Sequence, residues 1–170
     1  YGPDLLLATC EAGRTAGLRH FFFGGAPGVA GELATRLGRR FPGLVVCGTF
    51  TPPFRELTDA EFSTLRDQVA AAAPDIIWVG LSTPKQEKFM TAAAPHLDAS
   101  VLIGIGAAFD FHSGRVTQAP RWMQRSGLEW LHRLATEPRR LWRRYLVHNP
   151  RFVLRTFAQL TGLRRYPLHT

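Results

Sequence analysis

Cysteine is scarce in this 170-residue chain, and long hydrophobic runs are missing. Cys10 and Cys47 lie far apart and form no C-x-x-C pattern, which excludes a disulfide-rich scaffold and predicts two small buried thiols in a reducing cytoplasm. No stretch reaches the roughly 18–20 consecutive apolar residues that a membrane-spanning helix needs. The chain opens at Tyr1 without an initiator methionine or a signal-peptide pattern, and we expect an N-terminally incomplete protein.

Metal-ligand spacings and common catalytic motifs are also missing. The histidines are scattered without the spacing of metal ligands, at His20, His96, His112, His132, His148 and His169. No D-x-D sequence occurs, which excludes the usual motif for a metal-bound diphosphate. Neither G-x-S-x-G nor the Walker A pattern is present. The sequence therefore predicts no metal site and no cofactor.

The net charge of +8 is unevenly distributed. Residues 115–170 contain 12 arginines, no lysine and two acidic residues, a net charge of +10, whereas residues 1–114 carry a net charge of −2. Guanidinium groups bind phosphate oxygens in a bidentate fork. This arginine-rich and aromatic tail therefore indicates a nucleic acid, an anionic membrane surface or a phosphorylated substrate as its partner.

Residues 1–114 alternate predicted strands with predicted helices. Short apolar runs bounded by turn residues predict strands at 18–25, 43–49, 75–80 and 99–106. Apolar residues at helical spacing predict helices at 27–41, at 58–73 and after Pro84. The helix at 58–73 opens with Thr58 and Glu61 in capping-box spacing. This alternation predicts an α/β fold, a Rossmann-like, mostly parallel sheet with helices on both faces.

Beyond Gly114 the pattern changes to helices only. Prolines stand at expected helix starts, at Pro120, Pro138 and Pro150. They predict three or four short amphipathic helices with Trp, Leu and Phe on one side and Arg on the other. We therefore expect two domains, an α/β body at 1–114 and a basic, all-helical C-terminal appendage at 115–170.

Three loops follow predicted strand ends, at residues 23–28, 80–87 and 104–115. In an open α/β sheet, ligands bind outside the carboxyl ends of the strands. Glycines there let backbone amides approach a ligand, and a helix N-terminus favours an anion. A nucleotide diphosphate suits this arrangement. The glycines of the first loop do not form G-x-G-x-x-G, however, and an ordinary strand-to-helix turn is the alternative explanation for them.

Polar residues in the other two loops have alternative explanations. Pro84 is a natural first helical residue, and Glu87 is favourable to the helix dipole whatever its function. That explanation does not cover Lys85 and Gln86. The side-chain amide of Gln86 has both a hydrogen-bond donor and an acceptor, so it could bind a uracil edge or sugar hydroxyls. Asp110 stands between two phenylalanines and is either a ligand-facing group or a structural partner for an arginine.

Three longer stretches resemble one enzyme family. They read "VGLSTPKQEKFM", "IGIGAAFDFHSGRVTQAP" and "GLEWLHRLATEPRRLWRRYLVHNPRF". Together with "GPDLL" and "FFFGGAPGVA" they are similar to the WecG/TagA/CpsF glycosyltransferases over nearly the whole chain. The resemblance implies an inverting, metal-independent enzyme that moves N-acetylmannosamine or a related sugar from a UDP donor to a polyprenyl-diphosphate-linked acceptor. It also implies a peripheral location on the cytoplasmic face of the bacterial cell membrane, in the synthesis of teichoic acids or other surface polysaccharides.

The resemblance implies roles for individual residues as well. Gln86 matches the family's active-site glutamine, and we expect a donor site formed by Gly25, Pro84, Lys85, Gln86, Gly104, Gly106 and Asp110. Arginines of the family's appendage, which is thought to reach the donor diphosphate, match Arg133, Arg140 and Arg143. Ser82 replaces the family's usual glycine, and its side chain could restrict how closely the backbone of this loop approaches a ligand. The family's proposed general base, an aspartate, would lie upstream of Tyr1, so we expect these 170 residues alone to be inactive or impaired.

Two other functions stay open at this point. One is a basic module that grips RNA or DNA, which we do not favour because the arginines stand among Trp and Leu on helices, not on an aromatic strand platform. The other is a non-catalytic remnant that keeps the nucleotide pocket. Two roles are open for the aromatic residues of the tail, which are Trp122, Trp130, Trp142 and Phe152. They either anchor the protein in a membrane interface or pack the helices onto the body. The sequence does not decide whether the protein is a homo-oligomer.

Overall fold

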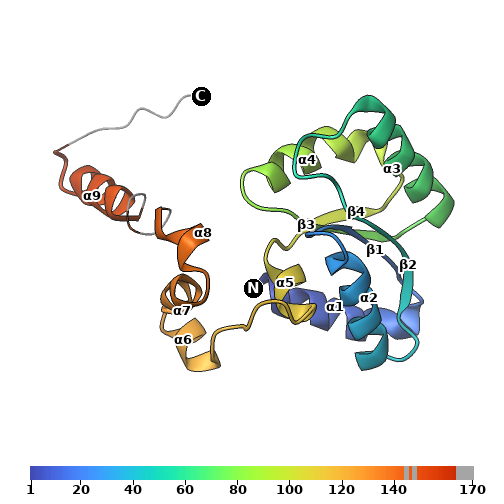
Figure 1. Ribbon diagram of the computed structural model, residues 1–170, viewed down its shortest axis with the longest axis horizontal. Coiled ribbons are helices and arrows are strands. Elements are labelled where there is room, and N and C mark those ends of the chain that lie inside the picture. The colour runs from blue at the N-terminus through green and yellow to red at the C-terminus, as the bar shows by residue number, and fades with distance from the viewer. Residues whose placement is uncertain (144–145, 147–148, 164–170) are drawn as a thin grey trace. The chain divides into compact units, whose positions relative to one another are not determined.

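Four parallel strands form the central sheet in the computed structural model of the chain, which describes residues 1–143, 146 and 149–163 (Figure 1). The strands are β1 (Arg19–Gly24), β2 (Val45–Phe50), β3 (Ile76–Gly80) and β4 (Val101–Gly104). Their order across the sheet is β2-β1-β3-β4, and every neighbouring pair is parallel. All four predicted strands are present, and the predicted α/β fold is confirmed.

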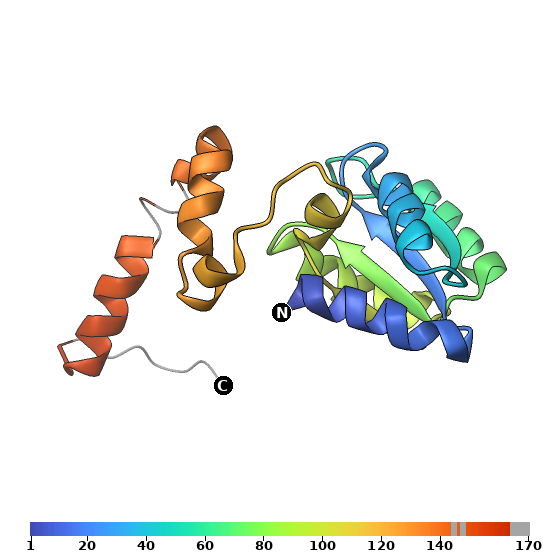
Figure 2. The same ribbon diagram turned by 90° about the horizontal axis from the view of Figure 1, so that it is seen from below.

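Helices cover both faces of the sheet (Figure 2). On one face, apolar side chains of α1 (Gly2–Ala16), α2 (Val29–Arg40) and α5 (Ala108–His112) surround Phe22 and Trp78. On the other, α3 (Asp59–Ala72), α4 (Lys85–Ala93) and a short 3₁₀ turn (Ala94–His96) lie over the side of the sheet that carries Phe21, Phe23 and Ile77. Successive strand residues point to opposite faces, so the continuous apolar runs of β1 and β3 supply both cores.

Local signals account for some of the helix boundaries. The predicted capping box of α3 is present, because Thr58 Oγ1 accepts from the N–H of Glu61 and Glu61 Oε2 accepts from the N–H of Thr58. α4 begins at Lys85, directly after Pro84 as predicted, and Pro84 is its N-cap and not its first helical residue. α1 was not predicted. Its buried residues do have helical spacing, but proline and glycine, which are poor helix formers, are among them: Pro3, Leu6, Cys10 and Gly13.

The direction of winding reverses between β1 and β3. From β1 the chain passes through α2 to β2 at one side of the sheet, whereas from β3 it passes through α4 to β4 at the other side. The carboxyl ends of β1 and β3 are therefore neighbours, and Gly24 pairs with Gly80. Open α/β sheets bind their ligands outside the strand ends at such a reversal.

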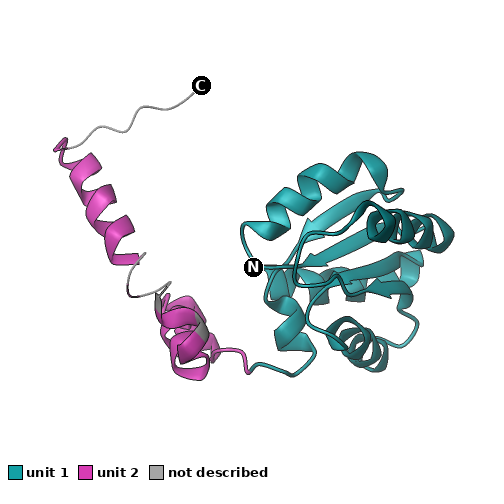
Figure 3. Ribbon diagram, turned by 45° about the horizontal axis from the view of Figure 1, so that its top comes forward, with its two compact units in different colours: residues 1–116 teal, residues 117–170 magenta. Residues whose placement is uncertain are grey.

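The chain forms two compact units, residues 1–116 and 117–170 (Figure 3). The predicted division at Gly114 falls two residues before the first unit ends. The second unit contains α6 (Arg121–Arg125), α7 (Glu129–Thr136), α8 (Pro138–Arg143) and α9 (Asn149–Leu160). The three prolines expected at helix starts lie at or beside the first residues of α6, α8 and α9.

Helix α9 exposes a set of large apolar side chains, namely Phe152, Val153, Leu154, Phe157 and Leu160. Its charged residues in the same stretch are Arg151 and Arg155, which makes the helix amphipathic and basic. Within the described ranges, no helix combines the length and the apolar character that crossing a membrane requires.

Candidate functional site at the strand ends

Glycines at the ends of β1 and β3 let the two loops meet backbone to backbone. The N–H of Gly25 donates to the carbonyl of Gly80 at 3.0 Å. A Cβ on Gly24 would lie 2.5 Å from that same carbonyl oxygen, and a Cβ on Gly80 would lie 2.4 Å from the ring of Phe109. Packing therefore requires these glycines. The N–H of Gly25, a residue predicted to contact the donor, is engaged within the protein.

Gln86 joins the loop after β3 to the loop after β4. Its Oε1 accepts from the N–H of Gly106 at 2.9 Å. Its Nε2 lies against Gly104, where a Cβ would be 2.3 Å away. The structure thus brings together three residues predicted for the donor site. This hydrogen bond uses one acceptor position of the amide oxygen and holds the Gln86 side chain between the two loops.

Lys85 joins the loop after β3 to the loop after β2. Its Nζ donates to the carbonyl of Phe54 at 3.2 Å and lies 4.3 Å from the centroid of the Phe54 ring, a cation–π contact. Phe54 was not among the residues predicted from the sequence for this region. The signal available was the stretch "TPPFREL" directly after a predicted strand, which places an aromatic residue behind two prolines at the strand end.

Glu87 takes part in the start of α4. Its Oε1 accepts from Thr83 Oγ1 at 3.1 Å, and both residues are exposed. The pair lies in the turn and first helical residues, where a carboxylate also complements the helix dipole. This geometry fits the helix-start interpretation of Glu87.

The third loop is tied to the first through Arg115. Its Nη2 donates to the carbonyl of Pro27 at 2.7 Å. The backbone carbonyl of Asp110 accepts from the N–H groups of Arg115 and Val116, at 3.0 and 3.2 Å, and so fixes the end of α5. Asp110 is half-buried within α5. All four strand-end loops are therefore linked into one rim.

The helices that begin at this rim differ in whether a side chain accepts a hydrogen bond from the N–H groups of the first turn. Within the described structure, neither α2 nor α4 has a side-chain hydrogen bond at its N-cap, whereas α3 has a complete capping box. The first N–H groups of a helix have no partner inside it. Together with the dipole they attract anions. Val29 and Gln86 already donate their N–H groups to the carbonyls of Ala26 and Ser82, at 3.0 and 3.1 Å. The starts of α2 and α4 therefore provide only their remaining first-turn amides, on the loops that leave β1 and β3.

The three arginines predicted for catalysis belong to the second unit. Arg133 lies in α7 and is half-buried. Arg140 and Arg143 lie in α8, and their side chains are outside the described residues. Their role as catalytic groups stays a prediction.

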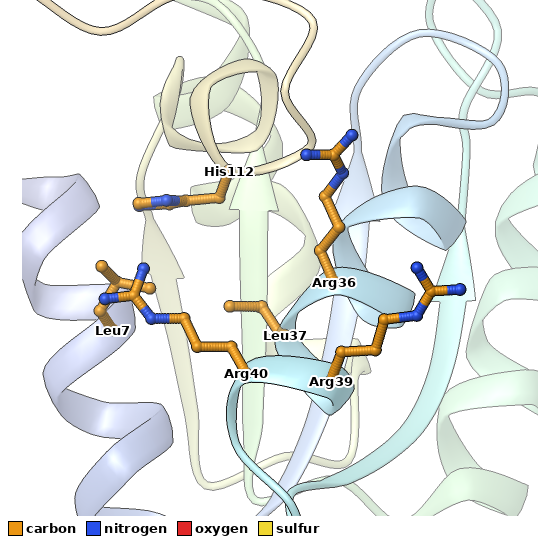
Figure 4. A pocket seen from close by; sticks show the side chains of 6 residues that line it. All are labelled: Leu7, Arg36, Leu37, Arg39, Arg40 and His112. Atoms are coloured by element: carbon orange, nitrogen blue, oxygen red, sulfur yellow. The ribbon is translucent and has the colours of Figure 1, made fainter.

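A pocket of about 430 Å³ lies elsewhere in the first unit (Figure 4). It is lined by Leu7, Arg36, Leu37, Arg39, Arg40 and His112. Arg39 and Arg40 occupy the last turn of α2, where cations stabilise the negative end of the helix dipole. Arg36 pairs with Glu32, and His112 Nε2 lies 3.0 Å from the carbonyl of Pro3. None of the glycine strand ends lines this pocket, so it is not the predicted site.

Among the described residues, no group of three or more His, Cys, Asp and Glu side chains could hold a metal ion. The rim lies at the reversal of winding between β1 and β3. It combines glycine strand ends, two helix N-termini without side-chain caps and the side-chain amide of Gln86. This combination defines the class of the molecule, an α/β protein whose site suits a phosphate-bearing ligand.

The chain belongs to the glycosyl transferase WecG/TagA/CpsF family, whose family model matches residues 1–166. This confirms the resemblance. A relative from Bacillus spizizenii is 34% identical over 145 residues, which are 85% of this chain and 54% of the relative. A relative from Bacillus subtilis is 34% identical over 128 residues, 75% of this chain and 48% of the relative. Both are named N-acetylglucosaminyldiphosphoundecaprenol N-acetyl-beta-D-mannosaminyltransferase, and the chain spans about half the length of each.

Proposed function

We propose that the protein to which these residues belong is a glycosyltransferase that moves N-acetylmannosamine, or a related sugar, from a UDP-sugar to a polyprenyl-diphosphate-linked acceptor. Membership of the family and the names of the two relatives support the acceptor and the sugar. The observation that carries the proposal is the convergence of two uncapped helix starts and the Gln86 amide on one rim. That rim suits the diphosphate and sugar of a donor.

The proposed reaction is a single displacement with inversion. A hydroxyl oxygen of the acceptor forms a bond to the anomeric carbon, the bond from that carbon to the diphosphate oxygen breaks, and UDP leaves with the electron pair. The hydroxyl proton passes to a general base, which we propose to be an aspartate outside these 170 residues. Without a metal ion, the charge of the leaving diphosphate is stabilised by hydrogen-bond donors and cations. In this proposal they are the amides that start α2 and α4 and the appendage arginines Arg133, Arg140 and Arg143.

Gln86 contributes a directed hydrogen bond in this proposal. With Oε1 held by Gly106, its Nε2 donates to a sugar hydroxyl or to a phosphate oxygen. That hydrogen bond restricts the rotation of the amide before a ligand binds, so less rotational freedom is lost on binding, which is favourable for affinity.

We further propose that the appendage lies peripherally on an anionic membrane surface at the cytoplasmic face. The support is α9, which combines Arg151 and Arg155 with an exposed apolar set that includes Phe152, Phe157 and Leu160. Helices of this kind bind anionic lipid through buried apolar area and electrostatic attraction. An acceptor embedded in that surface by its polyprenyl chain would then be within reach of the enzyme.

The decisive experiment measures release of UDP from UDP-N-acetylmannosamine in the presence of a lipid-linked N-acetylglucosamine acceptor. It uses the chain extended by the upstream segment that the family resemblance implies, with the 170-residue chain assayed in parallel. Turnover by the extended chain supports the proposal, and no turnover with any UDP-sugar would refute it. Binding of UDP without turnover would favour the non-catalytic remnant. Arg140→Ala and Gln86→Ala should each lower the rate.

A further inference from the structure

A basic pocket lies between α1, α2 and α5, on the face of the sheet where Phe22 and Trp78 are buried. Its volume of about 430 Å³ is typical of sites for small molecules. The lining contains three arginines and no acidic residue, and Leu7 and Leu37 supply its apolar part. Size and charge together suit a small anionic molecule with an apolar portion.

The positive charge of this pocket is only partly neutralised by the protein. Arg36 and Arg40 are four residues apart in α2, a spacing at which like charges share one helix face and repel each other. Glu32 pairs with Arg36 at 2.6 Å. Among the described residues, neither Arg39 nor Arg40 has an ion pair or a hydrogen-bond acceptor, and Arg40 only lies 5.4 Å from the ring of Phe41. The helix dipole favours cations in this turn, but it does not explain why they line a hollow.

The arginine side chains extend to different walls of the pocket (Figure 4). Arg40 extends toward Leu7 of α1, whereas Arg39 points away from both. Arg36 lies against the end of α5, where a Cβ on Gly114 would be 2.6 Å from Nη1 of Arg36. Glycine at residue 114 therefore leaves room for this guanidinium. Arg36 and Arg40 are thus placed to bind one ligand from two sides.

His112 contributes the α5 wall of the pocket. Its Nε2 donates to the carbonyl of Pro3 at 3.0 Å, which fixes the orientation of the ring. Burial lowers the pKa of His112, and the charge of Arg40 lowers it as well, whereas the hydrogen bond to Pro3 and the charge of Asp4 raise it. The ring is therefore uncharged at about pH 8 and can report on the pocket without titrating.

We propose that this pocket is a separate ligand site that binds the phosphate group of an organic phosphate through Arg36 and Arg40. Guanidinium groups bind phosphate oxygens in a bidentate fork. Leu7 and Leu37 contact the apolar part of the ligand. The same chemistry fits a soluble organic phosphate and the headgroup of an anionic phospholipid. The site goes beyond the proposed function, because no glycine strand end of the rim lines it.

The test follows the ring resonances of His112 by NMR while the 170-residue chain is titrated with inorganic pyrophosphate at about pH 8. We expect saturable shifts in the parent. Arg40→Gln and Arg36→Gln should each raise the Kd measured at His112 about tenfold, because each removes a hydrogen bond to a charged group. Arg40→Lys keeps the charge without the fork, so its Kd should lie between those of the parent and Arg40→Gln. Arg66→Gln is the matched control. It removes the same charge from α3 on the opposite face of the sheet and should bind like the parent.

Two further titrations identify the source of the phosphate. Glycerophosphoglycerol and dihexanoyl phosphatidylglycerol carry the same headgroup, and only the second has acyl chains. The lipid is kept below the concentration at which it forms micelles. Tighter binding of the lipid at His112 assigns the pocket to a phospholipid headgroup, and equal binding assigns it to a soluble organic phosphate. Either result supports the phosphate site.

Three results would overturn the inference. The first is the absence of a saturable shift at His112 in the parent with every probe. The second is an equal Kd for the parent and Arg40→Gln. The third is an equal weakening by Arg66→Gln, which would indicate attraction by net charge alone. The urea midpoint of each variant separates lost binding from lost folding. None of these results bears on the donor site, because the readout is confined to His112.

Discussion

Gly104→Ala should disturb the candidate site through Gln86. A Cβ at residue 104 would lie 2.3 Å from Nε2 and 2.7 Å from Cδ of Gln86, and 3.0 Å from Sδ of Met90. These separations are too short for real contacts, so the amide must move. It is the end of a flexible side chain and can do so at little steric cost. What is lost is the hydrogen bond to the N–H of Gly106, worth about 1 kcal/mol of unfolding free energy.

A double-mutant cycle measures this coupling by urea denaturation. Gln86→Ala removes the same hydrogen bond directly and should also lose about 1 kcal/mol. In the double variant the new Cβ meets no amide, so the pair should lose about 1 kcal/mol in total instead of about 2. Gly38→Ala is the matched control. A Cβ there meets nothing within 4 Å, and alanine in the interior of α2 should stabilise the protein by about 1 kcal/mol.

Two results would refute this reasoning. Additive losses in the cycle would show that the two residues act independently. An unchanged stability for Gly104→Ala alone would show that Gln86 can leave Gly106 without penalty, and its amide would then not be the fixed donor that the proposed function uses.

Three further predictions concern the core, the pH response and the appendage. Gly80→Ala should lower the unfolding free energy by about 1–3 kcal/mol, because its Cβ would lie 2.4 Å from the buried ring of Phe109; an unchanged urea midpoint would contradict it. Burial lowers the pKa of His20 and His112 below the ordinary 6.5, so the unfolded chain binds more protons below that pH. The unfolding free energy should therefore fall as the pH drops from about 7 to about 5, and a flat profile by urea denaturation at each pH would refute this. Arg155→Gln should weaken binding to anionic vesicles about fivefold, because each basic residue contributes about 1 kcal/mol, and co-sedimentation with the vesicles measures this binding. If the parent bound neutral vesicles equally well, the electrostatic part of the proposal would be refuted.

The geometry changes the interpretation of the polar turn at the start of α4. Lys85, Gln86 and Glu87 follow one another in sequence, yet each is committed to a different partner, namely Phe54, Gly106 and Thr83. Glu87 serves the helix start, Lys85 holds the loop after β2, and Gln86 spans to the loop after β4. The turn therefore connects the loops of the rim to one another. Only the donor groups that these internal hydrogen bonds do not use can bind a ligand.

Sequence alone determined the alternation of strands and helices, the capping box of α3 and the glycine loops at the strand ends. These features are local. A buried strand is a short apolar run, a capping box needs residues three apart, and parallel strands place their carboxyl ends on one edge. The local pattern is weak in α1, which has Pro3 and Gly13 among its buried residues, and this helix was not predicted.

Tertiary structure alone decided how the site residues are used. The strand order made β1 and β3 neighbours, so that Gly25 gives its N–H to Gly80. Gln86 binds an amide 20 residues away, and Lys85 binds a carbonyl 31 residues away. Such partners depend on which segments the sheet brings together, and no local pattern encodes that choice. Lys85 and Phe54, for example, come into contact only because the folded chain places the loop after β2 beside the start of α4.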